Sequence, residues 1–348
     1  SLIRQTAMIY GHGDDLYRYK GLVRANFSSN IYQRADLGEL KRHLADNLDI
    51  ICNYPEPAPL SLEKALADRL GIGTDNVIVT NGATEAIYLL AQNCMRKYGA
   101  GDFYNVIRQP TFSEYADACR ACGSQVVREK LTDGRQTVRW LCNPNNPTGG
   151  VVPAAELLQA ADTEPDCLFI IDQSYECYTT EPMINDKEAA CRNNVILLHS
   201  MTKRFCIPGL RLGYATACSR TISELKSLRH PWSVNAPAIE AGLFLLDRNT
   251  GIIPDLGEYL AEAQRLYHTL ASIDGIDVCP TLTNFMLASI NGHTAAELKD
   301  FLITRHGLLI RDASNFSGLT PSHFRVAAQG KTADDMLVEA IKDFCRLH

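Results

Sequence analysis

Short apolar runs alternate with amphipathic helical patterns over the larger, N-terminal part of the chain. The runs have the length of strands that are buried on both faces, and they cover residues 76–80, 102–107, 124–130, 137–142, 167–172 and 194–200. Helical spacing separates them, over residues 61–71, 83–95, 112–122 and 154–161. This order predicts an α/β fold with a mostly parallel sheet between helices, which binds ligands at the carboxyl ends of its strands.

The helix expected over residues 61–71 carries a signal at each end. Ser61 can accept a hydrogen bond from the first turn, as N-cap residues do. Gly71 can adopt the left-handed conformation with which many helices end. We therefore expect Ser61 to cap this helix and Gly71 to terminate it.

The pattern changes near residue 240. Helical spacing covers residues 236–248, 255–272, 297–305 and 334–345, and short strand patterns cover 275–278, 284–290, 307–312 and 323–328. These elements predict a smaller α+β lobe. For a chain of 348 residues, we expect an N-terminal arm (1–45) that forms part of the small lobe, a large domain (46–240) and a small C-terminal domain (241–348).

Composition and charge narrow the class of protein. Hydrophobic residues make up 46% of the chain and charged residues 21%, which is ordinary for a globular protein. No apolar stretch is long enough for a membrane span, so we expect no membrane partner. The formal net charge is −6 and no run of Lys or Arg occurs, so we expect no nucleic-acid partner.

The twelve cysteines are scattered along the chain without a disulfide spacing. Several lie inside apolar runs, as Cys142 and Cys167 do, which is typical of reduced core thiols. Cys119 and Cys122 form a C-x-x-C pair, but no second pair or nearby His completes a metal set. The first residues also lack the apolar core of a signal peptide. We therefore expect a cytoplasmic protein without a metal site.

The segment TNGATEA (80–86) runs from a strand into a helix. Gly82 permits a tight turn, and the backbone amides of Ala83 and Thr84 open the helix. Free amides and the helix dipole together make such an end an anion site. The alternative is an ordinary strand–helix turn.

Two further strand ends carry polar residues. In NPNNPTGG (143–150), the prolines and glycines could simply form a turn, or could hold Asn146 rigidly toward a ligand. In FIIDQSYECY (169–178), Asp172 ends a very apolar strand, and Tyr175 follows it by three residues. A carboxylate there needs a cation, which a pyridinium nitrogen would supply, unless it is only an N-cap.

The segment SMTKRFCIPGLR (200–211) brings two hydroxyls, an amine and a guanidinium to another strand end. Ser200, Thr202, Lys203 and Arg211 would suit an anion and an aldehyde bound side by side. Read alone, Lys203 could equally be a solvated surface charge.

The motifs NGATEA, PTFSEY, NPNNPTG, DQSYE, SMTK and GLRLGY occur in this order. In this set the chain resembles the pyridoxal 5′-phosphate (PLP)-dependent enzymes of aminotransferase fold type I, from about residue 10 to its end. The resemblance implies this fold, with PLP as the cofactor held by the large domain.

The resemblance also implies residue roles. Lys203 would form the Schiff base with the cofactor and carry protons, and Asp172 would keep the pyridine nitrogen protonated. The other implied cofactor contacts are Tyr175 and Asn146 at the phenolic oxygen, Phe112 on the ring face, and Ala83, Thr84, Ser200 and Arg211 at the phosphate. Tyr54 would reach the phosphate of a neighbouring subunit, which implies a homodimer.

Arg325, in HFRVAA, matches the family's arginine for the substrate carboxylate. His12, Asn30 and Arg311, with Asn146 also near the substrate, make the chain similar to the threonine-phosphate decarboxylase branch, a close relative of the histidinol-phosphate aminotransferases. One departure is that His12 is followed by Gly-Asp, where the branch typically has Gly-Gly. Arg311 could instead pair with Asp312 or another surface acid, and His12 could be a solvated loop residue.

The resemblance to this branch implies a phosphorylated amino acid as substrate and the decarboxylation of L-threonine O-3-phosphate in cobalamin biosynthesis. One alternative is transamination of histidinol phosphate with 2-oxoglutarate, which would use the same cofactor residues. Another is a protein that kept the fold for binding or regulation, against which the intact residue set argues. A dinucleotide-binding oxidoreductase is the remaining alternative, and no G-x-G-x-x-G follows the first predicted strand.

Overall fold

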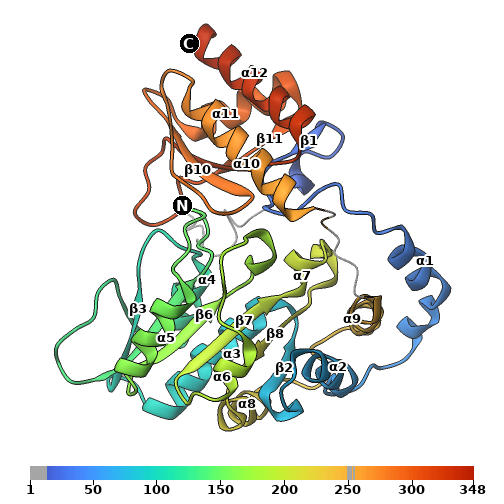
Figure 1. The fold of residues 1–348 in the computed structure, drawn as a ribbon, viewed down its shortest axis with the longest axis vertical. Coiled ribbons are helices and arrows are strands. Elements are labelled where there is room, and N and C mark those ends of the chain that lie inside the picture. The colour runs from blue at the N-terminus through green and yellow to red at the C-terminus, as the bar shows by residue number, and fades with distance from the viewer. Residues whose placement is uncertain (1–13, 249–252, 254) are drawn as a thin grey trace, which may run out of the picture.

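The computed structural model describes residues 14–248, 253 and 255–348. Figure 1 shows a larger lobe built on one sheet, and a smaller lobe in which the N-terminal and C-terminal segments of the chain lie together. His12 lies outside the described residues. The domain boundaries expected from the sequence stay a prediction.

The larger sheet has seven strands in the order β2-β8-β7-β6-β5-β3-β4. Their bounds are Val77–Thr80, Gly213–Thr216, Val195–Ser200, Leu168–Asp172, Gln136–Cys142, Phe103–Ile107 and Gln125–Val127. Neighbouring strands are parallel, except that β8 runs antiparallel to both β2 and β7. Every strand expected in this lobe is present, and β8 is a strand that the sequence pattern did not predict.

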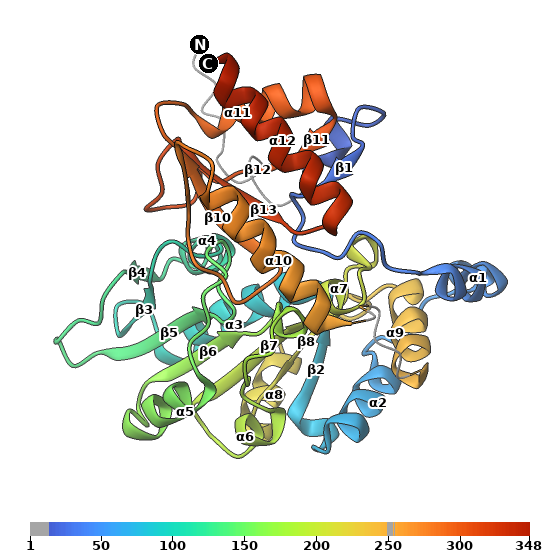
Figure 2. The same cartoon turned by 45° about the horizontal axis from the view of Figure 1, so that its top comes forward.

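Helices cover both faces of this sheet, as Figure 2 shows. The alternation along β6 separates the two faces, because Ile170 packs in one apolar cluster while Phe169 and Ile171 pack in another. The first cluster includes α3 (Gly82–Tyr98), α4 (Glu114–Ala121) and α8 (Ser219–Lys226), and the second includes α5 (Ala154–Thr163) and α6 (Asp186–Ala190). A third cluster joins α1 (Gly38–Asp46), α2 (Leu60–Leu70) and α9 (Ala236–Arg248) at the edge of the sheet.

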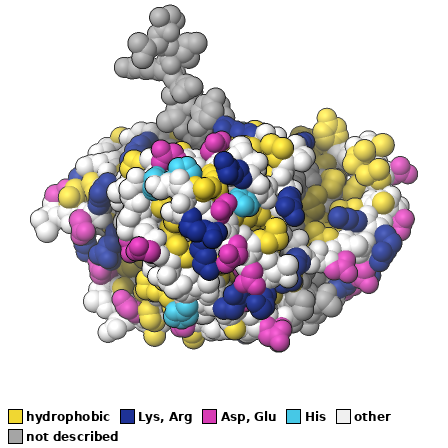
Figure 3. Space-filling view, turned by 90° about the horizontal axis from the view of Figure 1, so that it is seen from above, with side chains coloured by type: hydrophobic (Ala, Val, Ile, Leu, Met, Phe, Trp, Pro, Cys, Tyr) yellow, Lys and Arg dark blue, Asp and Glu magenta, His cyan; other side chains and the backbone are white. Residues whose placement is uncertain are grey.

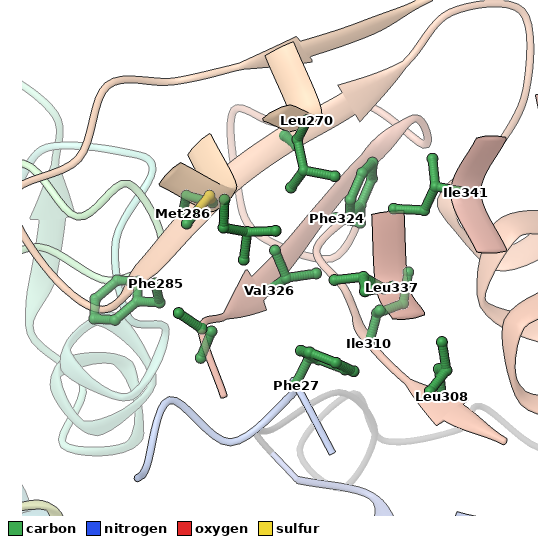
Figure 4. Close-up of a cluster of buried hydrophobic side chains, with 14 of the residues drawn as sticks. Phe27, Leu270, Phe285, Met286, Leu308, Ile310, Phe324, Val326, Leu337 and Ile341 are labelled. Carbon is green, nitrogen blue, oxygen red and sulfur yellow. The ribbon is translucent and has the colours of Figure 1, made fainter. Parts of the chain in front are cut away.

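The smaller lobe contains an antiparallel sheet in the order β12-β13-β10-β9. Its strands are Arg311–Asp312, His323–Ala327, Phe285–Ile290 and Ile276–Val278. It packs with helices α10 (Leu256–Ala271), α11 (Ala295–Phe301) and α12 (Lys331–Leu347). Strand β1 (Ala25–Asn26) pairs in parallel with β11 (Leu308–Leu309), and Figure 4 shows Phe27 inside the core of this lobe.

One expected cap is wrong. Helix α2 begins at Leu60 with Pro59 as its N-cap, so Ser61 lies inside the first turn. The Ser61 hydroxyl donates to Glu56 Oε2 at 2.6 Å and accepts no hydrogen bond as a cap. Gly71 does terminate the helix in the left-handed conformation, with φ of 67°.

The cysteines are free thiols, with Cys119 buried and Cys122 partly buried. Within residues 14–248, 253 and 255–348, no helix combines the length and the apolar character that crossing a bilayer requires. The same part of the chain holds no group of three or more His, Cys, Asp and Glu suited to a metal ion.

Candidate active site

A pocket lies at the carboxyl ends of β5, β6 and β7, and residues of both lobes line it. Of the predicted site residues that the structure describes, all except Tyr54 and Asn30 line this pocket. They come from segments far apart in sequence, because parallel strands bring their carboxyl ends to one edge of the sheet. Each wall of the pocket therefore offers contacts to a different chemical group of a ligand.

The first wall is the N-terminus of α3. Gly82 begins this helix with φ of +70°, and a Cβ at this position would lie 2.8 Å from Arg211 Nη2. The N-cap residue Asn81 makes no side-chain cap, so the following amides of Ala83 and Thr84 open onto the pocket. Backbone amides, a helix dipole and a guanidinium meet here, which is the donor set that a phosphate group requires.

Ser200 and Lys203 form the adjacent wall. Ser200 ends β7, and its hydroxyl caps the short helix α7 (Met201–Arg204) by accepting from Lys203 N at 3.3 Å. The Lys203 amine lies 5.5 Å from the ring centroid of Tyr175. Tyr178 donates to the backbone carbonyl of Lys203 at 2.9 Å. The lysine backbone is thus held in place while its amine faces the pocket.

Asp172 lies at the end of β6 with only 4% of its surface exposed. One carboxylate oxygen accepts from the backbone N of Ser174 at 2.9 Å and from its hydroxyl at 2.5 Å. The other accepts from the Tyr115 hydroxyl at 2.6 Å, and burial raises the pKa of Tyr115 well above its usual value, so Tyr115 stays a donor. These partners are neutral, and a cationic ring nitrogen would supply the positive charge that a buried carboxylate needs.

Tyr175 is joined to the N-terminal segment. Asn30 Nδ2 donates to the Tyr175 hydroxyl at 3.4 Å, and Asn30 is fully buried with a left-handed φ of 58°. The structure thus places Asn30 behind Tyr175 rather than on the pocket wall. Its predicted contact with substrate stays a prediction.

Asn146 and Arg325 form the opposite wall. Arg325 Nη1 donates to Asn146 Oδ1, and its Nη2 donates to the carbonyl of Ser28 at 2.6 Å. The Asn146 carbonyl is therefore turned to Arg325, which leaves its amide group to donate into the pocket. Arg325 is 2% exposed, its Nε donates to no described residue, and burial lowers its pKa to about 10.

Arg311 lines the pocket beside Arg325. Its Nη2 donates to Asn315 Oδ1 at 2.9 Å, and its Nη1 donates to the backbone carbonyl of Asp312. Burial lowers the pKa of Arg311, while Asp312 and Asp15 oppose the shift. Arg311 thus contacts the backbone of Asp312, and its pairing with an acidic side chain stays a prediction.

Tyr54 does not line this pocket. Its side chain is 84% exposed, and its ring lies 5.2 Å from that of Trp232. Contact with the site of a second subunit stays a prediction.

Several lining residues were missed from the sequence. They are Ser29, Ser113, Tyr115, Cys142, Ser174, Asn315 and Phe316. Tyr115 follows the predicted Phe112 by three residues, and Asn315 follows Arg311 by four. These two spacings could have indicated that Tyr115 and Asn315 lie near the site, but neither spacing shows which atom the side chain contacts.

The donor set matches one cofactor. An anion site, a buried carboxylate that forms no ion pair with a described residue, an amine and the ring of Phe112 surround a single pocket. PLP carries a phosphate, a pyridine nitrogen and an aldehyde, so each wall has a matching group. The fold and the site together define a PLP-dependent enzyme of fold type I.

Comparison with known proteins gives the family. The family model for aminotransferase class I and II matches residues 25–343, and the chain belongs to this family. Its members are PLP-dependent, and PLP is the cofactor of this chain.

The relatives include enzymes of two activities. One match is the crystal structure of L-threonine-O-3-phosphate decarboxylase from Porphyromonas gingivalis, whose sequence is 34% identical to this one. The TM-score is 0.87, and the match covers 92% of this chain and 99% of that one. Threonine-phosphate decarboxylase from Salmonella typhimurium is 28% identical over 98% of this chain and 94% of its own length. Histidinol-phosphate aminotransferase from Methanosphaera stadtmanae is 26% identical over 87% of this chain and 85% of its own.

Proposed function

We propose that this chain decarboxylates L-threonine O-3-phosphate to (R)-1-aminopropan-2-yl phosphate and carbon dioxide, as a step of cobalamin biosynthesis. The observation that carries the proposal is the pair Arg311 and Arg325. These residues lie directly opposite each other on β12 and β13, and both line the pocket. Like charges at such positions repel, and Arg311 adds to burial in lowering the pKa of Arg325. A substrate with one carboxylate and one phosphate would give each guanidinium an anion.

The residues divide the work of the reaction. Bound PLP supplies the electron sink for the pair released when the bond between Cα and the carboxylate breaks. Arg325 would hold the carboxylate in one direction through its guanidinium, which selects the bond that is weakened. Asp172 would keep a negative charge opposite the ring nitrogen. Lys203 is the amine placed to donate a proton to Cα after the carboxylate has left as carbon dioxide.

The same proposal includes a homodimer with shared active sites. Large hydrophobic side chains are exposed close to Tyr54 in sequence, namely Leu48, Ile51 and Leu60, and so is Trp232, whose ring contacts that of Tyr54. Figure 3 shows hydrophobic side chains gathered on the side of the molecule where Figure 1 places α1. A second copy would cover this surface and receive Tyr54. The cytoplasmic location expected from the cysteine pattern also belongs to this proposal.

Subunit complementation tests the shared site. Lys203→Ala and Tyr54→Ala proteins, each of low activity, would be mixed under conditions that exchange subunits. In a shared-site dimer, a hybrid holds one site with both residues intact, so activity should rise toward a quarter of the wild-type value in an equal mixture. Activity equal to the mean of the two single variants would contradict the shared site.

Transamination of histidinol phosphate is the second candidate, because a relative of that name matches most of the chain. One experiment separates the two. The PLP-loaded protein is mixed with L-threonine O-3-phosphate, and carbon dioxide and the phosphorylated amine are followed, with Lys203→Ala as the control. Turnover supports the decarboxylase. No carbon dioxide, together with conversion of the cofactor to its pyridoxamine form by histidinol phosphate, would assign the chain to the aminotransferases.

A further inference from the structure

A largely buried group of charges lies beneath the pocket and has no part in the reaction proposed above. His199 is 2% exposed, and its ring stacks on Tyr214 at 4.5 Å. Its Nδ1 lies 2.9 Å from Glu176 Oε1, and its Nε2 lies 2.7 Å from Asp186 Oδ1. We call Glu176, His199 and Asp186 the histidine clamp.

The geometry of the clamp requires a doubly protonated ring. A neutral imidazole has one N–H group, so it could donate to one carboxylate and would turn a lone pair toward the other. The two carboxylates correspondingly raise the pKa of His199 to about 10, against the opposing effect of its burial. The Asp186 carboxylate also accepts from the Thr216 hydroxyl at 2.5 Å, so its position is fixed from a second strand.

Two members of the clamp, His199 and Glu176, are connected to residues of the site. His199 precedes Ser200 on β7 and faces the other side of the sheet, because side chains alternate along a strand. Glu176 directly follows Tyr175 in the chain. The same Glu176 oxygen lies 3.9 Å from Arg204 Nη2, and Arg204 directly follows Lys203. The carboxylate of Glu176 therefore joins the segments that carry Tyr175 and Lys203.

We propose that His199 is a positioning residue which, through Glu176, fixes the placement and the electrostatic environment of Tyr175 and Lys203. His199 does not touch the pocket, since it is absent from its lining. The inference rests on the roles proposed above for Tyr175 and Lys203, and not on whether the reaction is decarboxylation or transamination.

The test uses the bound cofactor and no substrate. His199→Gln and Glu176→Gln proteins are loaded with PLP, and the visible absorption band is titrated with pH. Loss of the cationic ring should favour the protonated lysine nitrogen and move the midpoint up by about half a pH unit. Loss of the Glu176 charge should move it down by a similar amount. PLP affinity of the apo-protein should fall about tenfold in His199→Gln, as when an orienting partner is lost.

A matched control exists elsewhere in the chain. His43 Nε2 lies 2.6 Å from Glu240 Oε1, and its ring stacks on Phe244 at 4.2 Å. His43→Gln should lower the melting temperature without moving the midpoint or the PLP affinity. If the His199 and Glu176 variants behave like this control, the clamp is only structural and the inference is overturned. Should His199→Gln not fold, the shift in Glu176→Gln decides alone.

This outcome is separable from that of the proposed function. A wild-type protein that binds PLP but releases no carbon dioxide would refute the decarboxylase and leave the titration unaffected.

Discussion

The two buried arginines should each recognise a different anion of the substrate. Arg311→Gln should weaken recognition of the phosphate, and Arg325→Gln should weaken recognition of the carboxylate. Both changes keep a hydrogen-bonding side chain of moderate size and remove the charge. Because both guanidiniums are buried, solvent and salt screen their contacts little.

The expected size of each effect follows from the contacts that are lost. A hydrogen bond to a charged group contributes about 1.5–3 kcal/mol. This corresponds to about a 10- to 150-fold change in kcat/KM or in a binding constant. Arg311 already donates to Asn315, which fixes the orientation of one guanidinium nitrogen. Rearrangement of the neighbouring side chains should therefore recover little of the lost binding free energy.

Two truncated ligands separate the two anions. L-Threonine lacks the phosphate, so Arg311→Gln should lose activity with L-threonine O-3-phosphate and change little with L-threonine. 1-Aminopropan-2-yl phosphate lacks the carboxylate, so Arg325→Gln should bind it almost as the wild type does. Arg128→Gln is the control, since Arg128 donates to Ser317 at an exposed position. Equal losses by Arg311→Gln with both amino acids would refute the assignment.

Three further changes test other parts of the structure. The pKa of His199 is raised from 6.5 to about 10. Its contribution to stability is therefore complete below pH 6.5 and is lost as the pH rises toward 10. Urea unfolding should show this decline in the wild type and not in His199→Gln. Arg229→Met removes the 2.8 Å partner of the fully buried Glu63, while Lys226 remains 3.4 Å away, so the free energy of unfolding should fall by about 3 kcal/mol, measured by urea denaturation. Gly82→Ala places a Cβ against Arg211 at a left-handed φ, at a cost of about 1–2 kcal/mol, and PLP affinity measured on the apo-protein should fall.

The parallel strands could be predicted because their sequence signal is strong. A strand that is buried on both faces needs apolar side chains at nearly every position, as β7 shows with its six buried residues. Strand β8 was missed because Gly213–Thr216 is short and holds small or polar residues at most of its positions. It is a strand because β2 and β7 pair with it on either side, which is tertiary information.

The end of α2 could be predicted better than its start. Gly71 has a property that no other residue shares, free access to a left-handed φ, and the helix terminates there. Ser61 has a hydroxyl that many partners can satisfy. In the fold Glu56 lies within reach, and the helix begins two residues earlier than the cap would require.

Some features of the site could likewise be predicted from the sequence, and others could not. Asp172 and Lys203 could be located because Asp172 ends one strand and Lys203 follows another, and the sheet brings these ends together. The hydrogen bond from Tyr115 to Asp172 could not, since it depends on how α4 packs on the sheet. The clamp around His199 depends likewise on tertiary contacts among three segments.

The choice between the two reactions illustrates what the structure adds. Sequence places Arg311 and Arg325 fourteen residues apart, whereas the antiparallel register places them face to face. Histidinol phosphate carries a phosphate but no carboxylate, so an aminotransferase would use Arg325 for a carboxylate of its second substrate, 2-oxoglutarate, or use both guanidiniums for the phosphate. L-Threonine O-3-phosphate carries both groups and would divide them. Comparing L-threonine O-3-phosphate with L-threonine therefore tests how the anions are bound. If only the effect of Arg311→Gln depends on the phosphate, each arginine binds its own anion, as decarboxylation requires. If the effects of both variants depend on it equally, the pair forms a single phosphate site.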